Sequence, residues 1–233
     1  MGLLETVAAT LIGGERRIET AARNVTNVNT PGYKREVAFT QLINSGIAAP
    51  GSDTAQPTTS SVISLLQGTL VDTGNPLDLA VDGSAYLLVR DGNRYALSRG
   101  GQFALGSGGR LIDALGRILQ QAGGGDLEIA GIEIKILADG TVLDRETPVG
   151  AIGLYRASDS NHGASMMLRD TAMLEEDAGS EVRQGMVERS NVILSDEMVE
   201  LMRTQRQVEG GAQLVRAYDQ LMSQAISTFS RRG

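Results

Sequence analysis

Cysteine and tryptophan are absent from this 233-residue chain, and histidine occurs once. Without cysteine there is no disulfide framework, no thiolate nucleophile and no cysteine-based zinc site. Aromatic residues make up only 3% of the chain, which leaves few ring faces for stacking bases or sugars. The fold must therefore be held together by packing alone, and base-stacking and sugar-stacking functions are disfavoured.

Positive charge is also in short supply. The chain has 21 Lys+Arg against 28 Asp+Glu, a formal net charge of -7, which disfavours non-specific binding to nucleic acids or anionic membranes. No apolar run approaches the roughly 20 residues of a membrane span, and the start lacks the basic region of a secretory signal. We therefore expect no nucleic-acid partner, no membrane insertion and no cleaved signal peptide.

Catalytic patterns are equally sparse. The single His162 lies in a polar turn, where a solvated loop histidine is favoured over a general base. Lysine occurs only at Lys34 and Lys135, and neither follows a glycine in a phosphate-binding loop. The glycine runs at 106–109 and 123–125 are better explained as hairpin turns. The prediction is no catalytic residue, no metal site, no cofactor and no small-molecule substrate.

The N-terminal end has a helical repeat. Four apolar residues recur there at intervals of seven: Leu4, Leu11, Ile18 and Val25. This spacing is typical of a coiled-coil seam, although Gly13 and Gly14 interrupt it and predict a helix that is weak or bends there. The helix is predicted to stop in an Asn-rich stretch, where Pro31 and Gly32 suit a type II turn.

The C-terminal end repeats the pattern over a greater length. Six residues recur at sevenfold spacing: Leu194, Leu201, Val208, Val215, Met222 and Phe229. Four residues after the first five of them come Met198, Gln205, Ala212, Asp219 and Ile226. A continuous helix over these positions would be about 54 Å long. Its stripe needs a partner.

Between these ends the pattern changes to short apolar runs separated by turn residues, which predicts strands. The predicted strands are 77–81, 86–90, 94–98, 103–105, 111–112, 117–119, 132–137, 141–143 and 152–155. Residues 44–61 are predicted to form a linker or a long exposed hairpin. The fold class is therefore α+β, with N- and C-terminal helices forming a coiled-coil domain and an inserted, antiparallel all-β body of sandwich or barrel type.

This organisation predicts four segments. The N-terminal helix and its turn occupy 1–35, a connecting, extended β region and linker occupies 36–76, and the β domain occupies 77–187. The C-terminal helix, 188–233, joins 1–35 in one helical domain. A β body with its own core cannot cover both helical stripes, so the helices must pack on each other or on neighbouring subunits. Assembly is the favoured interpretation, and an intramolecular helical hairpin capping the β domain is the alternative.

Three blocks of residues resemble one family. The first is 23–35, an Asn-rich stretch followed by Thr30, Pro31, Gly32, Tyr33 and Lys34; the second begins at 74–83 and continues through 86–116; the third is 185–192 with 197–206. In this order they are similar to the signatures of bacterial flagellar rod and hook proteins. The motif-turn residues singled out by the resemblance are Asn24, Asn27, Pro31, Gly32, Tyr33, Ser190 and Asn191.

The resemblance implies a mechanical function. Family members build a hollow helical tube that transmits torque and passes exported subunits, with paired terminal helices inside and the β domain outside. It implies other rod subunits, proximal and distal, as partners, together with the flagellar type III export apparatus. It places the protein in the basal-body rod that crosses the periplasm. Other interpretations are a different rod or hook member of the family, a phage-tail subunit, or an oligomeric β-domain enzyme or ligand-binding module.

Overall fold

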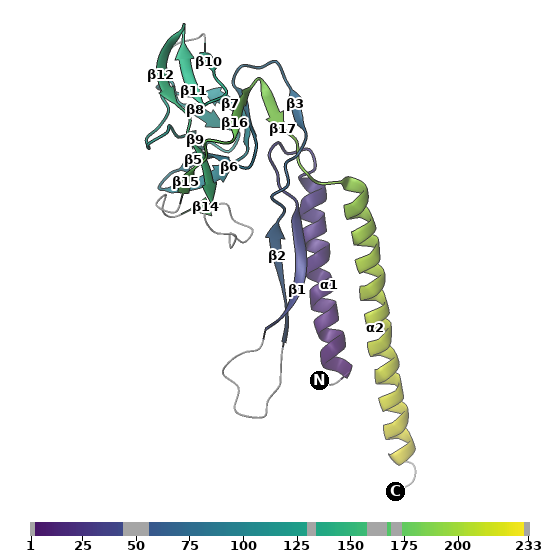
Figure 1. Ribbon diagram of the computed structural model, residues 1–233. Coiled ribbons are helices and arrows are strands. Elements are labelled where there is room, and N and C mark those ends of the chain that lie inside the picture. The colour runs from purple at the N-terminus through teal and green to yellow at the C-terminus, as the bar shows by residue number, and fades with distance from the viewer. Residues whose placement is uncertain (1–2, 44–55, 130–133, 158–166, 169–173, 231–233) are drawn as a thin grey trace. The chain divides into compact units, whose positions relative to one another are not determined.

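A computed structural model describes residues 3–43, 56–129, 134–157, 167–168 and 174–230 (Figure 1). The fold is α+β. The helices are α1 (Leu3–Thr26) and α2 (Leu194–Ser230). The first strands are β1 (Glu36–Ile43), β2 (Gln56–Ile63), β3 (Leu70–Asp72), β4 (Asp78–Asp82), β5 (Tyr86–Asp91), β6 (Arg94–Ser98), β7 (Gly100–Leu105), β8 (Leu111–Asp113) and β9 (Ile118–Leu119). They are followed by β10 (Ile134–Ile136), β11 (Thr141–Asp144), β12 (Thr147–Ala151), β13 (Leu154–Ala157), β14 (Met167–Leu168), β15 (Leu174–Glu176), β16 (Glu181–Gln184) and β17 (Met186–Glu188).

The chain divides into two compact units. The helical unit comprises 1–26, 36–62 and 193–233, and the β unit comprises 27–35 and 63–192. In the helical unit α1 and α2 pack side by side, and β1 and β2 form a two-stranded sheet with β1 next to α1. The part of the predicted linker that the structure describes, 56–61, lies in β2; residues 44–55 lie outside the described part of the chain.

The glycines at 13 and 14 do not interrupt α1. The helix runs without interruption from Leu3 to Thr26, and Gly14 lies against α2. A Cβ atom at Gly14 would stand 2.6 Å from Val208 Cγ2, and one at Gly211 would stand 3.1 Å from Leu11 Cδ2. The missing side chains let the two helices approach closely, so the packing that glycine permits outweighs its cost of about 1 kcal/mol in helix propensity.

The β unit consists of antiparallel strand pairs. Its largest sheet follows the order β14-β6-β5-β9-β8-β7-β4-β16, with β13 pairing both β5 and β15. A three-stranded sheet β10-β11-β12 and the pair β17-β3 complete it. Its core is aliphatic and centres on Leu79, Leu87, Leu111, Leu119 and Leu127, which are fully buried.

All nine predicted strands overlap strands of the structure, and the errors are omissions. Sequence patterns gave no strands for β12 and β14–β17, and they placed β1, β2 and β3 only within the extended β region 36–76. Apart from β1, whose eight residues include five hydrophobic ones, these strands are polar or short. β12, for example, contains Pro148, and only one residue of β16, Val182, is a buried hydrophobic side chain. No helix in the described residues is both long and apolar enough to cross a membrane.

A bidentate ion pair between Arg90 and Asp126 connects strand β5 to the turn at Asp126. Arg90 Nε donates to Asp126 Oδ1 at 2.9 Å and Nη2 donates to Oδ2 at 2.6 Å, while the buried Gln120 donates to Oδ1 at 2.8 Å. These hydrogen bonds, that from Arg90 above all, hold the pKa of Asp126 below its ordinary value. The paired carboxylate therefore stabilises the fold at neutral pH.

Asp126→Asn is expected to lower the free energy of unfolding by about 1 kcal/mol at pH 7, since the pair is partly exposed. A folded-state pKa below the unfolded value stabilises the protein above that unfolded value, and this contribution disappears as pH falls through the folded pKa. The difference between wild type and variant should therefore shrink between about pH 5 and pH 2. Urea unfolding at several pH values measures this, and a pH-independent difference would contradict it.

Candidate functional site

The three sequence motifs meet in the β unit around one buried carboxylate. Glu188, the last residue of β17, accepts a hydrogen bond from Lys34 Nζ at 2.6 Å on Oε1 and one from Arg99 Nε at 2.8 Å on Oε2. Their side chains are 1%, 3% and 2% exposed, respectively. Each comes from a different block of the sequence. We call Lys34, Arg99 and Glu188 the motif junction.

Backbone groups complete the hydrogen bonding of the motif junction. The N–H of Gly68 donates to Glu188 Oε1 at 2.8 Å, and Lys34 Nζ donates a second bond to the carbonyl of Leu66 at 2.7 Å. Arg99 Nη2 donates to the carbonyl of Val81 at 3.0 Å, and Nη1 donates to that of Ala85. Because buried charges are costly unless they are paired and hydrogen-bonded, this set of partners is what allows the junction to exist.

The motif junction carries two positive side chains against one negative side chain. Burial lowers the pKa of Lys34, the contact with Glu188 raises it, and the neighbouring Arg99 lowers it. The Arg99 guanidinium also lies 5.3 Å from the centre of the Tyr86 ring, which offers its negative face to the cation. Glu188 is thus the group that balances the buried cations.

Asn191 and Gly32 reinforce the junction through the backbone. The side-chain oxygen of Asn191 accepts from the N–H of Arg35 at 2.6 Å, and its amide nitrogen donates to the carbonyl of Leu66 at 2.8 Å. Gly32 has φ +69° and its N–H donates to the carbonyl of Glu188 at 2.7 Å. The N–H of Tyr33 donates to the Thr30 carbonyl at 3.2 Å, which confirms the predicted turn at Pro31 and Gly32.

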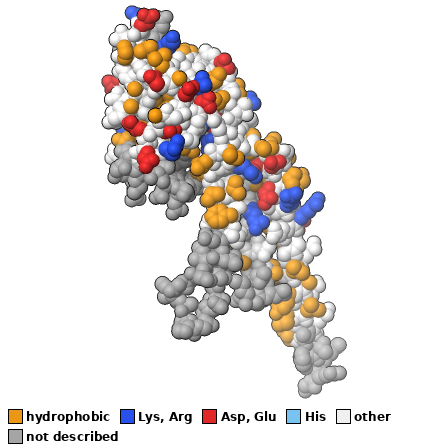
Figure 2. Space-filling view, viewed as in Figure 1, with side chains coloured by type: hydrophobic (Ala, Val, Ile, Leu, Met, Phe, Trp, Pro, Cys, Tyr) orange, Lys and Arg blue, Asp and Glu red, His pale blue; other side chains and the backbone are white. Residues whose placement is uncertain are grey.

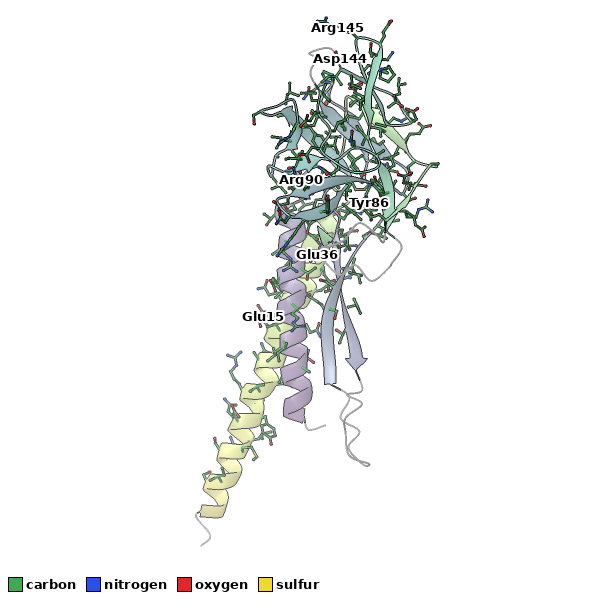
Figure 3. All side chains as sticks on the ribbon, turned by 90° about the vertical axis from the view of Figure 1, so that its left-hand side faces the viewer. Glu15, Glu36, Tyr86, Arg90, Asp144 and Arg145 are labelled. Carbon is green, nitrogen blue, oxygen red and sulfur yellow. The ribbon has the colours of Figure 1, made fainter. Side chains whose placement is uncertain are left out.

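Asn24 plays a similar bridging part in the helical unit. It is fully buried on α1; its Oδ1 accepts from the N–H of Glu36 at 2.9 Å, and its Nδ2 donates to the Glu36 carbonyl at 2.8 Å. The same nitrogen donates to the buried carboxylate of Glu197 on α2 at 3.0 Å. Figure 3 labels Glu36, the first residue of β1, beside α1. One amide therefore joins α1, β1 and α2.

The predicted seam residues of the two helices differ in burial: some are half-buried and others are exposed. On α1, Leu11, Ile18 and Val25 are half-buried. On α2, Leu201, Val208, Ala212 and Val215 are half-buried, whereas Leu194, Met198, Met222 and Ile226 are exposed. The side chains of Leu4 and Phe229 lie outside the described residues.

The second row of buried positions on α2 differs from the predicted one. Glu197, Thr204 and Gly211 are buried, and they lie three residues after Leu194, Leu201 and Val208, not four. The apolar residues of the predicted second row therefore do not supply the buried face. Hydrophobic side chains consequently remain exposed along α2 (Figure 2).

The remaining motif residues have local contacts. Thr30 Oγ1 donates to Asn27 Oδ1 at 3.1 Å, Ser190 Oγ accepts from the N–H of Val192 at 3.3 Å, and Pro31 is exposed. His162 lies outside the described residues. Sequence reasoning missed the roles of Glu188, Arg99 and Glu197, since periodicity carries no information on which polar side chains pair across the chain.

Comparison with known proteins identifies the family. Residues 183–228, which run from β16 into α2, match the model of the flagellar basal body rod FlgEFG protein C-terminal family. The chain is 30% identical over 233 residues to flagellar basal-body rod protein FlgF of Mesorhizobium japonicum, covering 94% of this chain and 93% of that protein. The chain belongs to the flagellar basal-body rod family. It is a structural subunit of the flagellar basal-body rod.

Other similar proteins are also flagellar basal-body rod proteins. FlgF of Rhizobium meliloti is 30% identical over 92% of both chains, and FlgG of Bacillus subtilis is 26% identical over 91% of this chain and 93% of its own length. Within the flagellar rod family, the chain is more similar to these FlgF proteins than to this FlgG protein. The protein therefore belongs at the flagellar basal body, in a family of structural proteins.

Proposed function

We propose that this rod subunit assembles with proximal and distal rod proteins into a hollow helical tube by burying the terminal helices. The observation that carries the proposal is the apolar surface left exposed on α2. The exposed apolar residues of this helix are Leu194, Met198, Val199, Met202, Leu214, Leu221, Met222 and Ile226. An isolated soluble subunit gains nothing from exposing so many large apolar side chains along one helix.

Burial of apolar side chains between subunits would supply the free energy of assembly. A fully buried large apolar side chain contributes about 1.5–3 kcal/mol, so several of them together offset much of the cost of ordering the helices in an assembly. Leu4, Leu11, Ile18, Val25 and the C-terminal seam are the proposed subunit-interaction residues. Paired as a coiled coil, the helices would form the inner layer, with the antiparallel body, of sandwich or barrel type, facing outwards.

The functional division follows from this arrangement. Segments 1–35 and 188–233 supply the helical inner domain, 77–187 the outward β domain, and 36–76 the region between them. The tube transmits torque and leaves a channel for exported subunits. The subunit reaches the rod unfolded through the type III apparatus, and a chain with no cysteine needs no disulfide step before assembly.

Limited trypsin digestion followed by mass spectrometry tests the proposal. In dilute purified protein, the ends near 1–26 and 193–233 should be cut first, at sites such as the exposed Arg206 and Arg216, while the body resists, including at the exposed Arg94. In isolated basal bodies the cuts in α2 should slow by about 10-fold or more, because assembly buries the helix. A dilute chain that resists as one intact unit would show that the helices need no partner subunits.

A further inference from the structure

We propose that Glu188 works as a latch: it makes the docking of segment 27–35 on the β body conditional on the arrival of the C-terminal segment 185–192. All the residues of the latch lie in the β unit. The latch sets the order in which segments of one chain dock during folding. This property is separate from the assembly of subunits.

Segment 27–35 forms hydrogen bonds with the C-terminal segment. The N–H of Gly32 donates to the Glu188 carbonyl, the Tyr33 carbonyl accepts from the N–H of Asn191, and the N–H of Arg35 donates to the Asn191 side chain. These three bonds go to 188–191, although the two segments are more than 150 residues apart in sequence. Segment 27–35 therefore docks on a surface that the C-terminal segment itself provides.

A second group of bonds goes to the segment that follows β2. The Arg35 carbonyl accepts from the N–H of Ser64 at 2.7 Å, and Lys34 Nζ donates to the Leu66 carbonyl. Segment 63–68 is held in turn by the C-terminal segment, because Asn191 donates to Leu66 and Glu188 accepts from Gly68, and by Gln67, which bonds to Val81 and Gly83. Both docking surfaces thus include contacts with residues 188–191.

The latch itself is electrostatic. Lys34 and Arg99 are buried on opposite oxygens of the same carboxylate. Without Glu188, docking of segment 27–35 would bring Lys34 into a buried site that already holds the Arg99 cation, with only carbonyl groups as acceptors. Burying two like charges without a counter-ion is strongly unfavourable. The latch is therefore asymmetric: removing Lys34 leaves a balanced Arg99–Glu188 pair, whereas removing Glu188 leaves two unbalanced cations.

The latch has a consequence for a chain that emerges N-terminus first, a point that rests on the proposed export route. The motif turn after α1 would stay undocked until residue 188 has emerged, which is four-fifths of the way along the chain. Premature docking of the N-terminal segment on an incomplete body would be prevented by charge. The C-terminal segment would act as the signal that the body is complete.

Hydrogen-exchange mass spectrometry on the full purified chain tests the latch. Glu188→Gln is expected to raise exchange of amides in 32–35 and 64–68 by about 10- to 100-fold, while amides in β5 and β6 change by less than about 2-fold. Lys34→Met should raise exchange less than Glu188→Gln does. The double variant should exchange more slowly than Glu188→Gln alone, because one of the two unbalanced cations has been removed.

Matched variants make the outcome decisive. Glu181→Gln removes an exposed carboxylate seven residues away on β16 and should leave exchange unchanged. If Glu188→Gln does not fold, Glu188→Asp is measured instead. It keeps the counter-charge on a shorter side chain, so 32–35 should open only partly while β5 and β6 stay unchanged. Equal and additive effects of the two single changes, opening of β5 and β6 to the same extent, or no opening would each overturn the latch. The measurement involves no flagellar assembly, so its failure is distinguishable from failure of the proposed function.

Discussion

A strain whose rod subunit carries Val208→Asp is expected to lose swimming while the β body of the protein stays folded. Val208 lies on the face of α2 that contacts α1, where its Cγ2 atom occupies the space opened by Gly14. A carboxylate there must be desolvated against helix backbone, which costs several kcal/mol unless the helices separate. Leu201, half-buried and seven residues earlier, is expected to behave in the same way when changed to Asp.

The measurement combines swimming in soft agar with recovery of the subunit in purified basal bodies. Gln207→Asp adds the same charge at an exposed neighbouring position of α2 and should swim normally. Gly14→Val should also impair swimming, because the added side chain on α1 would clash with Val208 on α2. Adding Val208→Ala to this variant should partly restore swimming, because the smaller side chain makes room for the valine. Normal swimming by Val208→Asp and Leu201→Asp would contradict helix pairing as the basis of assembly.

Gly109→Ala is expected to cause a large loss of stability in the β body. Gly109 has φ +77°, and a Cβ atom there would stand 2.2 Å from the backbone carbonyl oxygen of Ile129. That oxygen belongs to a segment held by the hydrogen bond from the Ile129 N–H to the Gly109 carbonyl at 2.8 Å. Positive φ costs about 1–2 kcal/mol for a residue with a side chain, and overpacking adds about 1–3 kcal/mol.

The neighbouring glycine provides the control. Gly108 has φ +78°, almost the same backbone conformation, but a Cβ atom there would meet nothing within 4 Å. Gly108→Ala should therefore lose only the conformational part, about 1–2 kcal/mol. Urea unfolding of both variants, followed by a spectroscopic signal of the β body, separates the two contributions. Equal losses for Gly108→Ala and Gly109→Ala would show that contact with Ile129 is unimportant.

The prediction from sequence worked best where hydrophobic periodicity is strong. The long C-terminal helix and strands such as β5 and β6 were located correctly because their apolar residues repeat with the helix or strand period. Strands without such a pattern were missed. β16 has a single buried hydrophobic residue, Val182, and forms because four of its residues pair with β4, which precedes it in the chain by about a hundred residues. Pairing of this kind is a property of the whole sheet.

The motif residues show a second limit. Asn24, Gly32 and Asn191 were selected by resemblance, and the structure gives them hydrogen bonds that explain their residue types. Glu188 and Glu197 were not selected, although both are almost completely buried. From sequence alone a glutamate is expected to be exposed to solvent, because most glutamates are. Only its contacts with residues distant in sequence show that it is buried and paired.

The amino-acid sequence by itself determined that this protein has helices at its two ends and a β body between them. It also determined the family, because periodicity and motif order can be read along the chain. Only the tertiary structure decided which row of α2 faces α1, which glycines must lack a side chain, and that Lys34, Arg99 and Glu188 share one buried site. The physical reason is that packing and charge pairing depend on distances between residues remote in sequence, which local patterns do not specify.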